Sequence, residues 1–174
     1  MVGEPEGTRS PTPWTTSWNI DVKSDTPTKL KEISGNTLEL EVTIKNPTAK
    51  ECGLDVLCDK EDAYRVRIAY ISATKILKVG NVDAPFELKP GEDLTLRVFI
   101  DKNLVEVFAN DRQAALNARG GYAPDPLHPD RILPLIPRGG GVPDNLGISL
   151  FSTGGDAAVK QVKGWKMKSS YADK

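Results

Sequence analysis

The side chains with the greatest capacity for chemistry lie along one stretch of the sequence, residues 94–112, and on the nearby segment 65–70. Carbohydrate sites combine an aromatic surface with carboxylate, amide and guanidinium groups that form paired hydrogen bonds. These two segments supply such groups within a short span, so they are a candidate ligand-binding surface. The candidate residues are Arg97, Asp101, Glu106, Asn110, Asp111 and Arg112, with Arg67 and Tyr70 added from the second segment.

The same charged residues have a purely structural alternative. Arg97 and Asp101 share the polar phase of an alternating pattern, and both could join Glu106 in cross-strand ion pairs that fix a hairpin. Glu106 is of particular interest, because Val105 and Val107 flank it and its own face also carries apolar residues. A carboxylate in such surroundings needs partners. The binding and the structural interpretations both stay open at this level.

The sequence does not indicate a catalytic or metal-binding site. A Ser-His-Asp triad would need His128, the only histidine, which lies in a proline-rich stretch that is a flexible place to hold a base. Zinc sites need several His or Cys ligands, whereas this chain has one His and two distant Cys. The acidic run 59–62 suits a charged turn better than a calcium site. We therefore expect no catalytic residue, no metal and no cofactor.

The two cysteines, Cys52 and Cys58, are expected to be free thiols. On one extended strand they would lie about 20 Å apart, whereas a disulfide needs Cα atoms within about 7 Å. Their spacing also excludes a CxxC metal or redox motif. We predict that both thiols are mostly buried.

The composition is that of an ordinary globular chain of 174 residues, long enough to bury one core. The 23 basic and 24 acidic side chains are interspersed, with a net charge of −1 and no basic stripe, so no nucleic-acid partner is expected. No apolar run approaches the about 20 residues of a membrane span. Residues 1–13 have neither a basic start nor an apolar stretch, so they do not indicate a signal peptide.

Hydrophobic residues alternate with polar ones in many short segments, which is typical of half-buried strands. No segment of about ten residues shows helical periodicity. Short strands separated by frequent turns predict an all-β fold, a two-sheet antiparallel β-sandwich of jelly-roll or concanavalin A-like type. The expected strands cover residues 38–44, 54–58, 66–70, 76–79, 94–100, 104–109 and 146–150, with a last strand or two between 159 and 167.

The chain is expected to form one domain with a tail. Residues 1–13 are polar and rich in proline, so we predict a flexible N-terminal tail. Residues 14–174 then form the sandwich. Residues 121–145 carry many prolines and glycines, which oppose central strands and helix interiors, so they are expected to be a long loop without regular structure.

The stretch Leu94-Thr-Leu-Arg-Val-Phe-Ile-Asp-Lys-Asn-Leu-Val-Glu-Val-Phe-Ala-Asn110 resembles the signature hairpin of the C-terminal module of family 32 glycoside hydrolases. The segments 84–88, 146–152 and 165–169 resemble the same module, so the likeness runs from about residue 38 to residue 171. The family comprises invertases, levanases, inulinases and fructosyltransferases. Its members pair a five-bladed catalytic propeller with a β-sandwich, and related sandwiches occur as fructan-binding modules.

The family's catalytic motifs are not matched here. The family places its nucleophile in Asn-Asp-Pro, its stabiliser in Arg-Asp-Pro and its acid in Glu-Cys. In this sequence Asn110-Asp111 is followed by Arg112, and Asp125 lacks the preceding Arg. Glu51-Cys52 is present by chance, since it precedes a sandwich strand and has no partner motif. The resemblance therefore implies a module that is not an enzyme on its own.

Two functional hypotheses follow. The first is a non-catalytic, carbohydrate-associated sandwich that binds a fructan or fructoside, or that serves as the accessory domain of a β-fructosidase-type hydrolase. The second is a structural or oligomerisation module without sugar binding. The partners implied are a carbohydrate, a catalytic propeller domain or a second copy of the chain. The family is usually extracellular or periplasmic, and the location of this chain is left open.

Overall fold

The computed structural model describes residues 13–58, 65–117, 122–124, 132–134 and 146–167, and these form an open β-sandwich of two antiparallel sheets. The predicted fold class is confirmed. Among the described residues there is no helix, and hence none with the length and apolar character that a membrane span requires. His128 and the acidic run 59–62 lie outside the described residues, as does almost all of the predicted tail.

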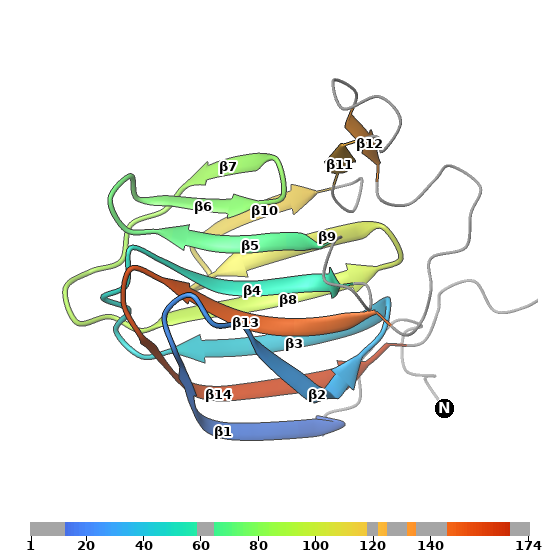
Figure 1. The fold of residues 1–174 in the computed structure, drawn as a ribbon, viewed down its shortest axis with the longest axis horizontal. Coiled ribbons are helices and arrows are strands. Elements are labelled where there is room, and N and C mark those ends of the chain that lie inside the picture. The colour runs from blue at the N-terminus through green and yellow to red at the C-terminus, as the bar shows by residue number, and fades with distance from the viewer. Residues whose placement is uncertain (1–12, 59–64, 118–121, 125–131, 135–145, 168–174) are drawn as a thin grey trace, which may run out of the picture.

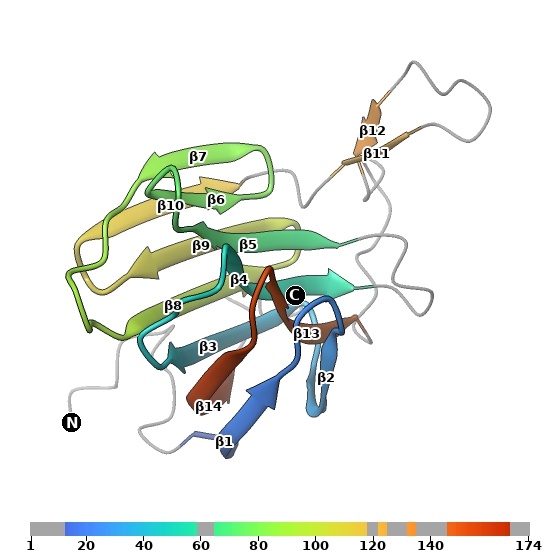
Figure 2. The ribbon, with the colours of Figure 1, turned by 60° about the vertical axis from the view of Figure 1, so that its left-hand side comes forward.

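The two sheets have six strands each and lie face to face (Figures 1 and 2). Sheet A has the order β1-β14-β3-β8-β9-β10, and sheet B has the order β2-β13-β4-β5-β6-β7. The bounds in sheet A are β1 Thr15–Val22, β14 Ala157–Lys166, β3 Thr37–Ile44, β8 Leu94–Asp101, β9 Leu104–Ala109 and β10 Gln113–Asn117. Those in sheet B are β2 Thr28–Ser34, β13 Gly147–Thr153, β4 Glu51–Cys58, β5 Val66–Ile71, β6 Ile76–Val79 and β7 Val82–Pro85.

The alternation in the sequence fixes which face of each strand is dry. In β3, β8 and β9 the register brings apolar residues into cross-strand pairs, for example Leu40 with Val98 and Val98 with Val107, all fully buried. Because successive side chains point to opposite faces, the intervening residues form the outer face of sheet A. The inner residues of the two sheets form one core, which includes Leu38, Leu40, Val42, Leu96, Val98, Ile100, Val105 and Val107 of sheet A and Leu54, Val56, Ile68, Leu77, Ile148 and Leu150 of sheet B.

The last segment forms one strand, β14, rather than two. Its register with β3 shifts between Val159 and Gln161, which marks a β-bulge. The shift explains why the apolar residues of this strand do not keep a period of two. It also places Trp165 opposite Glu39 on the outer face of sheet A, where the indole is nevertheless buried.

The stretch 121–145 is not wholly irregular, contrary to our expectation. Residues Tyr122–Pro124 form β11 and pair with β12, Ile132–Pro134, in a separate two-stranded ladder that stands beside the sandwich in Figure 1. Prolines oppose a central strand because they have no backbone N–H to donate to a neighbouring strand. In a two-stranded ladder each strand is an edge, so proline at a strand end is tolerated.

Asn117, the last residue of β10, joins the two sheets at one edge of the sandwich. Its side-chain amide donates to Val79 O at 3.3 Å and to Asn81 Oδ1 at 2.9 Å, both in the β6–β7 turn of the other sheet. The turn accommodates this contact because Gly80 has a φ of 57°, and a Cβ there would lie 2.1 Å from Asn117 Nδ2. The bond closes the edge at which β10 faces β6 and β7.

Both cysteines lie on β4 and are free and buried, as predicted. Desolvation raises the pKa of the Cys52 thiol to about 12, with the nearby Glu51 carboxylate as a second cause. A thiol with so high a pKa is not a nucleophile at neutral pH. Cys52 therefore belongs to the packing of the sandwich, and Cys58 is buried on the same strand.

Gly53 tests how tightly the middle of sheet B is packed. A Cβ at this position would lie 1.9 Å from Ile68 O on the adjacent strand β5. We predict that Gly53→Ala lowers the free energy of unfolding by about 1–3 kcal/mol, since the two strands would have to move apart. Gly147→Ala is the control, because its Cβ would meet nothing closer than Cys58 O at 3.9 Å. Urea denaturation of both variants measures the difference, and equal midpoints would contradict the prediction.

Candidate functional site

The outer face of β8, β9 and β10 carries three of the eight candidate residues. Arg97 lies opposite Phe108, Glu106 lies opposite Phe99, and Asp101 ends β8 at the hairpin turn. Arg97 is thus not the cross-strand neighbour of Glu106, so the proposed ion pair within the hairpin is not formed by these two residues. The hairpin is held instead by its inner apolar pairs.

Arg97 makes its ion pair with the preceding strand of the sheet. Its Nε donates to Glu39 Oε1 of β3 at 2.7 Å, and its guanidinium lies 5.0 Å from the centre of the Phe99 ring. The Glu39 side chain is only 1% exposed, whereas that of Arg97 is 38% exposed. A carboxylate so far removed from water depends on its hydrogen-bonded partner. The sequence alone does not single out Glu39, because the alternating pattern marks it as an ordinary polar residue on the outer face.

Glu106 is the centre of an apolar surface. Its cross-strand neighbours are Phe99 on β8 and Leu116 on β10. The Phe99 and Phe108 rings lie edge to face with centroids 5.9 Å apart, and Leu116 is 46% exposed. Within the described part of the chain, the Glu106 carboxylate forms no ion pair. We call the surface formed by Phe99, Leu104, Glu106, Phe108, Ala114 and Leu116 the β8–β10 outer patch.

Asn110 and Arg112, in the β9–β10 turn, are occupied by structural contacts. Asn110 has a φ of 48°; its Oδ1 accepts from Thr95 N at 2.7 Å, and its Nδ2 donates to Asp93 O at 2.8 Å and Glu92 Oε1 at 3.0 Å. Arg112 donates through both terminal nitrogens to the Glu92 carboxylate and also to Glu87 O at 2.9 Å.

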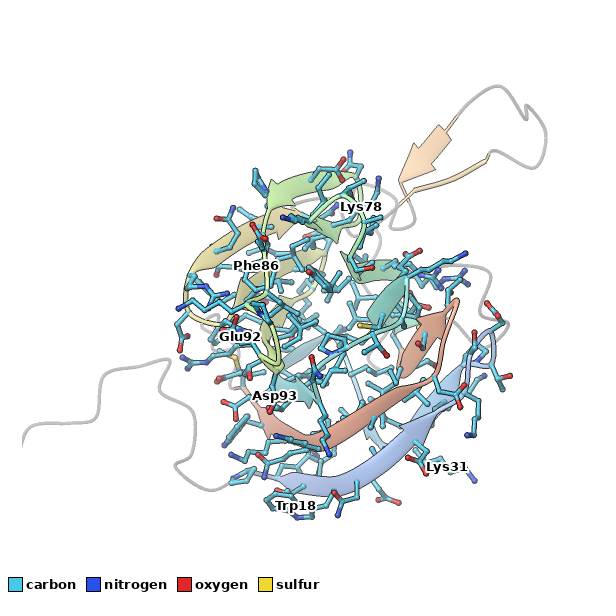
Figure 3. The ribbon with its side chains drawn as sticks, turned by 90° about the vertical axis from the view of Figure 1, so that its left-hand side faces the viewer. Trp18, Lys31, Lys78, Phe86, Glu92 and Asp93 are labelled. Atoms are coloured by element: carbon cyan, nitrogen blue, oxygen red, sulfur yellow. The ribbon has the colours of Figure 1, made fainter. Side chains whose placement is uncertain are left out.

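These contacts fasten the loop between β7 and β8, where Figure 3 shows Phe86, Glu92 and Asp93 on one side of the molecule. The hydrogen bond from Arg112, followed by those from the Lys89 amide and the Asn110 side chain, lowers the pKa of Glu92 to about 2. Asp111, between the two anchored residues, is exposed and has a φ of 53°. The turn is therefore a clamp, in which only Asp111 presents its side chain fully to solvent.

Arg67 and Tyr70 lie in sheet B and do not join the residues of sheet A. Arg67 forms a paired hydrogen bond with Asp55, with Nε and Nη2 each 2.9 Å from a carboxylate oxygen, and its guanidinium lies 4.0 Å from the centre of the Phe151 ring. Tyr70 is 6% exposed and packs edge to face on Phe86 in the core. The structure therefore distributes the eight candidates over two sheets and one turn instead of one site.

A hollow of about 310 Å³ lies at the end of the sandwich where β2 passes into β3 and β14 ends. Trp14 contributes an indole that is 40% exposed, and the Lys166 ammonium lies 4.6 Å from the centre of its ring. The other lining residues are Ser34, Gly35, Asn36, Thr37, Leu38 and Met167. Asp101 is close by, because it pairs with Thr37 in the ladder. The sequence alone does not indicate this hollow, since its walls come from three separated segments.

No group of three or more His, Cys, Asp and Glu side chains within the described ranges is arranged to hold a metal ion. The acidic side chains described above are engaged by arginine, lysine or amide groups, or lie singly on the surface. The residues described above therefore give sheet A an outer face that is both polar and aromatic.

The family is established by sequence. The model of the glycosyl hydrolases family 32 C-terminal domain matches residues 6–166, so the chain belongs to this family as its C-terminal β-sandwich domain. The predicted resemblance is therefore confirmed. No curated protein sequence matches the chain significantly. The matching model is that of the family's C-terminal domain and not that of its catalytic domain.

Solved structures share the fold at low sequence identity. The exo-inulinase from Aspergillus awamori is similar with a TM-score of 0.63 and 15% identity over 94% of this chain and 31% of its own. Fructan 1-exohydrolase IIa from Cichorium intybus is similar with a TM-score of 0.62 and 11% identity over 88% of this chain and 35% of its own. The beta-fructofuranosidase from Aspergillus kawachii is similar with a TM-score of 0.60 and 17% identity over 86% of this chain and 27% of its own. The chain thus spans about a third or less of the length of these proteins.

The Glu92–Arg112 pair predicts a loss of stability in acid. The folded-state pKa of Glu92, about 2, is below its ordinary value of 4.5, so ionised Glu92 favours the folded state. This contribution is complete above pH 4.5 and is lost as the pH falls through about 2. The melting temperature of the wild type should therefore drop more over this range than that of Glu92→Gln. Arg112→Gln should flatten the acid slope in the same way, and an unchanged slope in both variants would contradict the clamp.

Proposed function

We propose that this domain is the non-catalytic accessory part of a fructoside-processing enzyme, and that it packs on a catalytic domain through the β8–β10 outer patch. The family and the lengths of the compared enzymes support a partner domain, because the chain matches 27–35% of their chains. The finer point, which surface meets that partner, rests on the chemistry of the outer face of sheet A.

The observation that carries the proposal is the Glu106 carboxylate, which lies between Phe99 and Leu116, while Arg97 at the edge of the patch is paired with Glu39. In this patch Leu116 is 46% exposed and Phe99, Leu104 and Phe108 are half-buried, and apolar side chains left partly exposed together on a sheet face mark an interaction surface. A single carboxylate at its centre calls for a cationic side chain on the partner, since a charge buried without a partner would be costly. The expected partner surface is therefore apolar with one Arg or Lys. A second copy of this patch is a poorer fit, because its own Glu106 would repel the first if the two met near a twofold axis.

Saccharide binding is the second candidate function. The observations that favour it are the hollow beside Trp14 and the exposed Asp101, together with the half-exposed Arg97 on the outer face. Guanidinium and carboxylate groups can form paired hydrogen bonds with sugar hydroxyls, and an aromatic ring can pack on the C–H face of a sugar. Among the compared structures, one fructan 1-exohydrolase is in complex with 1-kestose and one fructofuranosidase is in complex with fructose. A fructan or fructoside is therefore the proposed ligand class.

Association with a catalytic domain tests the first function. The chain is mixed with a separately produced family 32 catalytic domain from the same source, and binding is followed by sedimentation velocity. We expect Glu106→Arg to weaken binding by about 2–5 kcal/mol, since truncating one side of a buried charge pair costs about that much. Asp83→Arg is the control, because it makes the same charge change on the opposite sheet.

Failure of the wild type to associate with the catalytic domain would contradict the proposal. So would equal weakening by both substitutions, because the effect would then follow net charge and not the patch. Self-association of the chain that Glu106→Arg abolishes would instead support the oligomerisation alternative.

Calorimetric titration of the wild-type chain with levan, inulin, sucrose and fructose tests the second function. We expect weak binding, with a dissociation constant of about 1 mM, because a small shallow site offers few contacts. Heats no larger than dilution for all four ligands would contradict saccharide binding and leave assembly as the function.

A further inference from the structure

We propose that the hollow between Trp14, the β2–β3 turn and the end of β14 is the saccharide site of this domain. The inference rests on the proposed saccharide-binding function and goes beyond it by naming the site. None of its lining residues belongs to the hairpin from which a ligand surface was expected. Its volume of about 310 Å³ suits a small ligand, such as one or two sugar rings.

The wall of the hollow is held rigid before any ligand arrives. The turn at 34–37 is bonded to three separate segments: Gly35 N donates to Leu146 O at 2.8 Å, Lys102 N donates to Asn36 O at 2.7 Å and Met167 N donates to Thr37 O at 3.4 Å. A wall fixed in this way loses little conformational freedom on binding, so the few available contacts yield more affinity.

The buried Asn36 strengthens this wall from within. Its Oδ1 accepts hydrogen bonds from Thr37 Oγ1 at 3.0 Å and Lys102 Nζ at 3.2 Å, and the residue is 4% exposed. Asn36 and Thr37 thus add polar groups to a lining that also contains the apolar Leu38 and Met167. A sugar, which has both hydroxyl groups and C–H faces, suits such a mixed lining better than a hydrocarbon does.

The mouth of the hollow offers the two features by which proteins hold sugars. The indole of Trp14 presents an apolar ring on which the C–H face of a sugar can lie. The Lys166 ammonium lies over one face of that ring, 4.6 Å from its centre, so a sugar would stack on the other face while the ammonium remains a donor at the mouth of the hollow. The exposed Ser34 adds a hydroxyl that both donates and accepts.

An anion is a weaker candidate for this hollow. Among the described residues that line the hollow, Lys166 is the only one with a charged side chain, and the ammonium of the nearby Lys102 is directed to Asn36. Asp101, which pairs with Thr37 in the ladder, adds a negative charge close to the rim. The balance of charge therefore favours a neutral saccharide over a phosphate or a carboxylate.

The experiment is calorimetric titration of the full chain with 1-kestose, sucrose, fructose and inorganic phosphate. The variants that remove the site are Trp14→Ala and Lys166→Met. Their controls are Trp18→Ala and Lys31→Met, which remove the same residue types from β1 and β2 outside the hollow. Figure 3 shows both control residues on the outside of the sandwich, and Trp18 is 63% exposed. Melting temperatures verify that each variant remains folded.

We expect a saccharide to bind the wild type, and Trp14→Ala and Lys166→Met to weaken binding by about tenfold or more, with both controls within about twofold. Binding of saccharide that survives Trp14→Ala but is lost in Arg97→Ala would overturn the assignment to the hollow while leaving the saccharide function intact. Absence of saccharide binding to the wild type would overturn both. Binding of phosphate in preference to every sugar would also overturn the assignment.

Discussion

The structure depends on the exclusion of water from the space between two sheets. Burial of Leu40, Val98 and Val107 on three adjacent strands requires their register to be kept, because a slip by one residue would turn every apolar side chain to the outside. The same requirement sets the outer face, since each residue next to an inner one must point away from the core. The polar and aromatic outer surface of sheet A is therefore a direct result of the dry interior.

The outer faces of both sheets and the β9–β10 turn are shaped by how their charges are neutralised. Arg97 forms an ion pair with Glu39, Arg112 with Glu92 and Arg67 with Asp55. Each of these three arginines therefore stabilises the sandwich. Guanidinium groups held in this way keep their aromatic neighbours in place through cation–π contacts. The surfaces that remain available for a partner are the β8–β10 outer patch and the hollow at one end of the sandwich.

The sequence predicts the fold well because strand alternation is a local signal. It identifies the strands around residues 38–44, 94–100 and 104–109, and the hairpin motif leads to the correct family. It misses β1 and β2, where the inner and outer residues differ little in polarity, and the bulge in β14, where one extra residue breaks the period. The partners of the candidate residues depend on register between strands far apart in the chain, so Glu39, opposite Phe99, is invisible to a local pattern.

The burial of both thiols has a practical use. The 174 residues contain two cysteines, and both lie inside the sandwich, so maleimide reagents find no exposed thiol on the native domain. A cysteine introduced at Leu116, which is 46% exposed on β10, would then be the preferred point of attachment for a dye or spin label. Spectroscopic probes can in this way report on the sheet face from a native background, without first removing the natural cysteines.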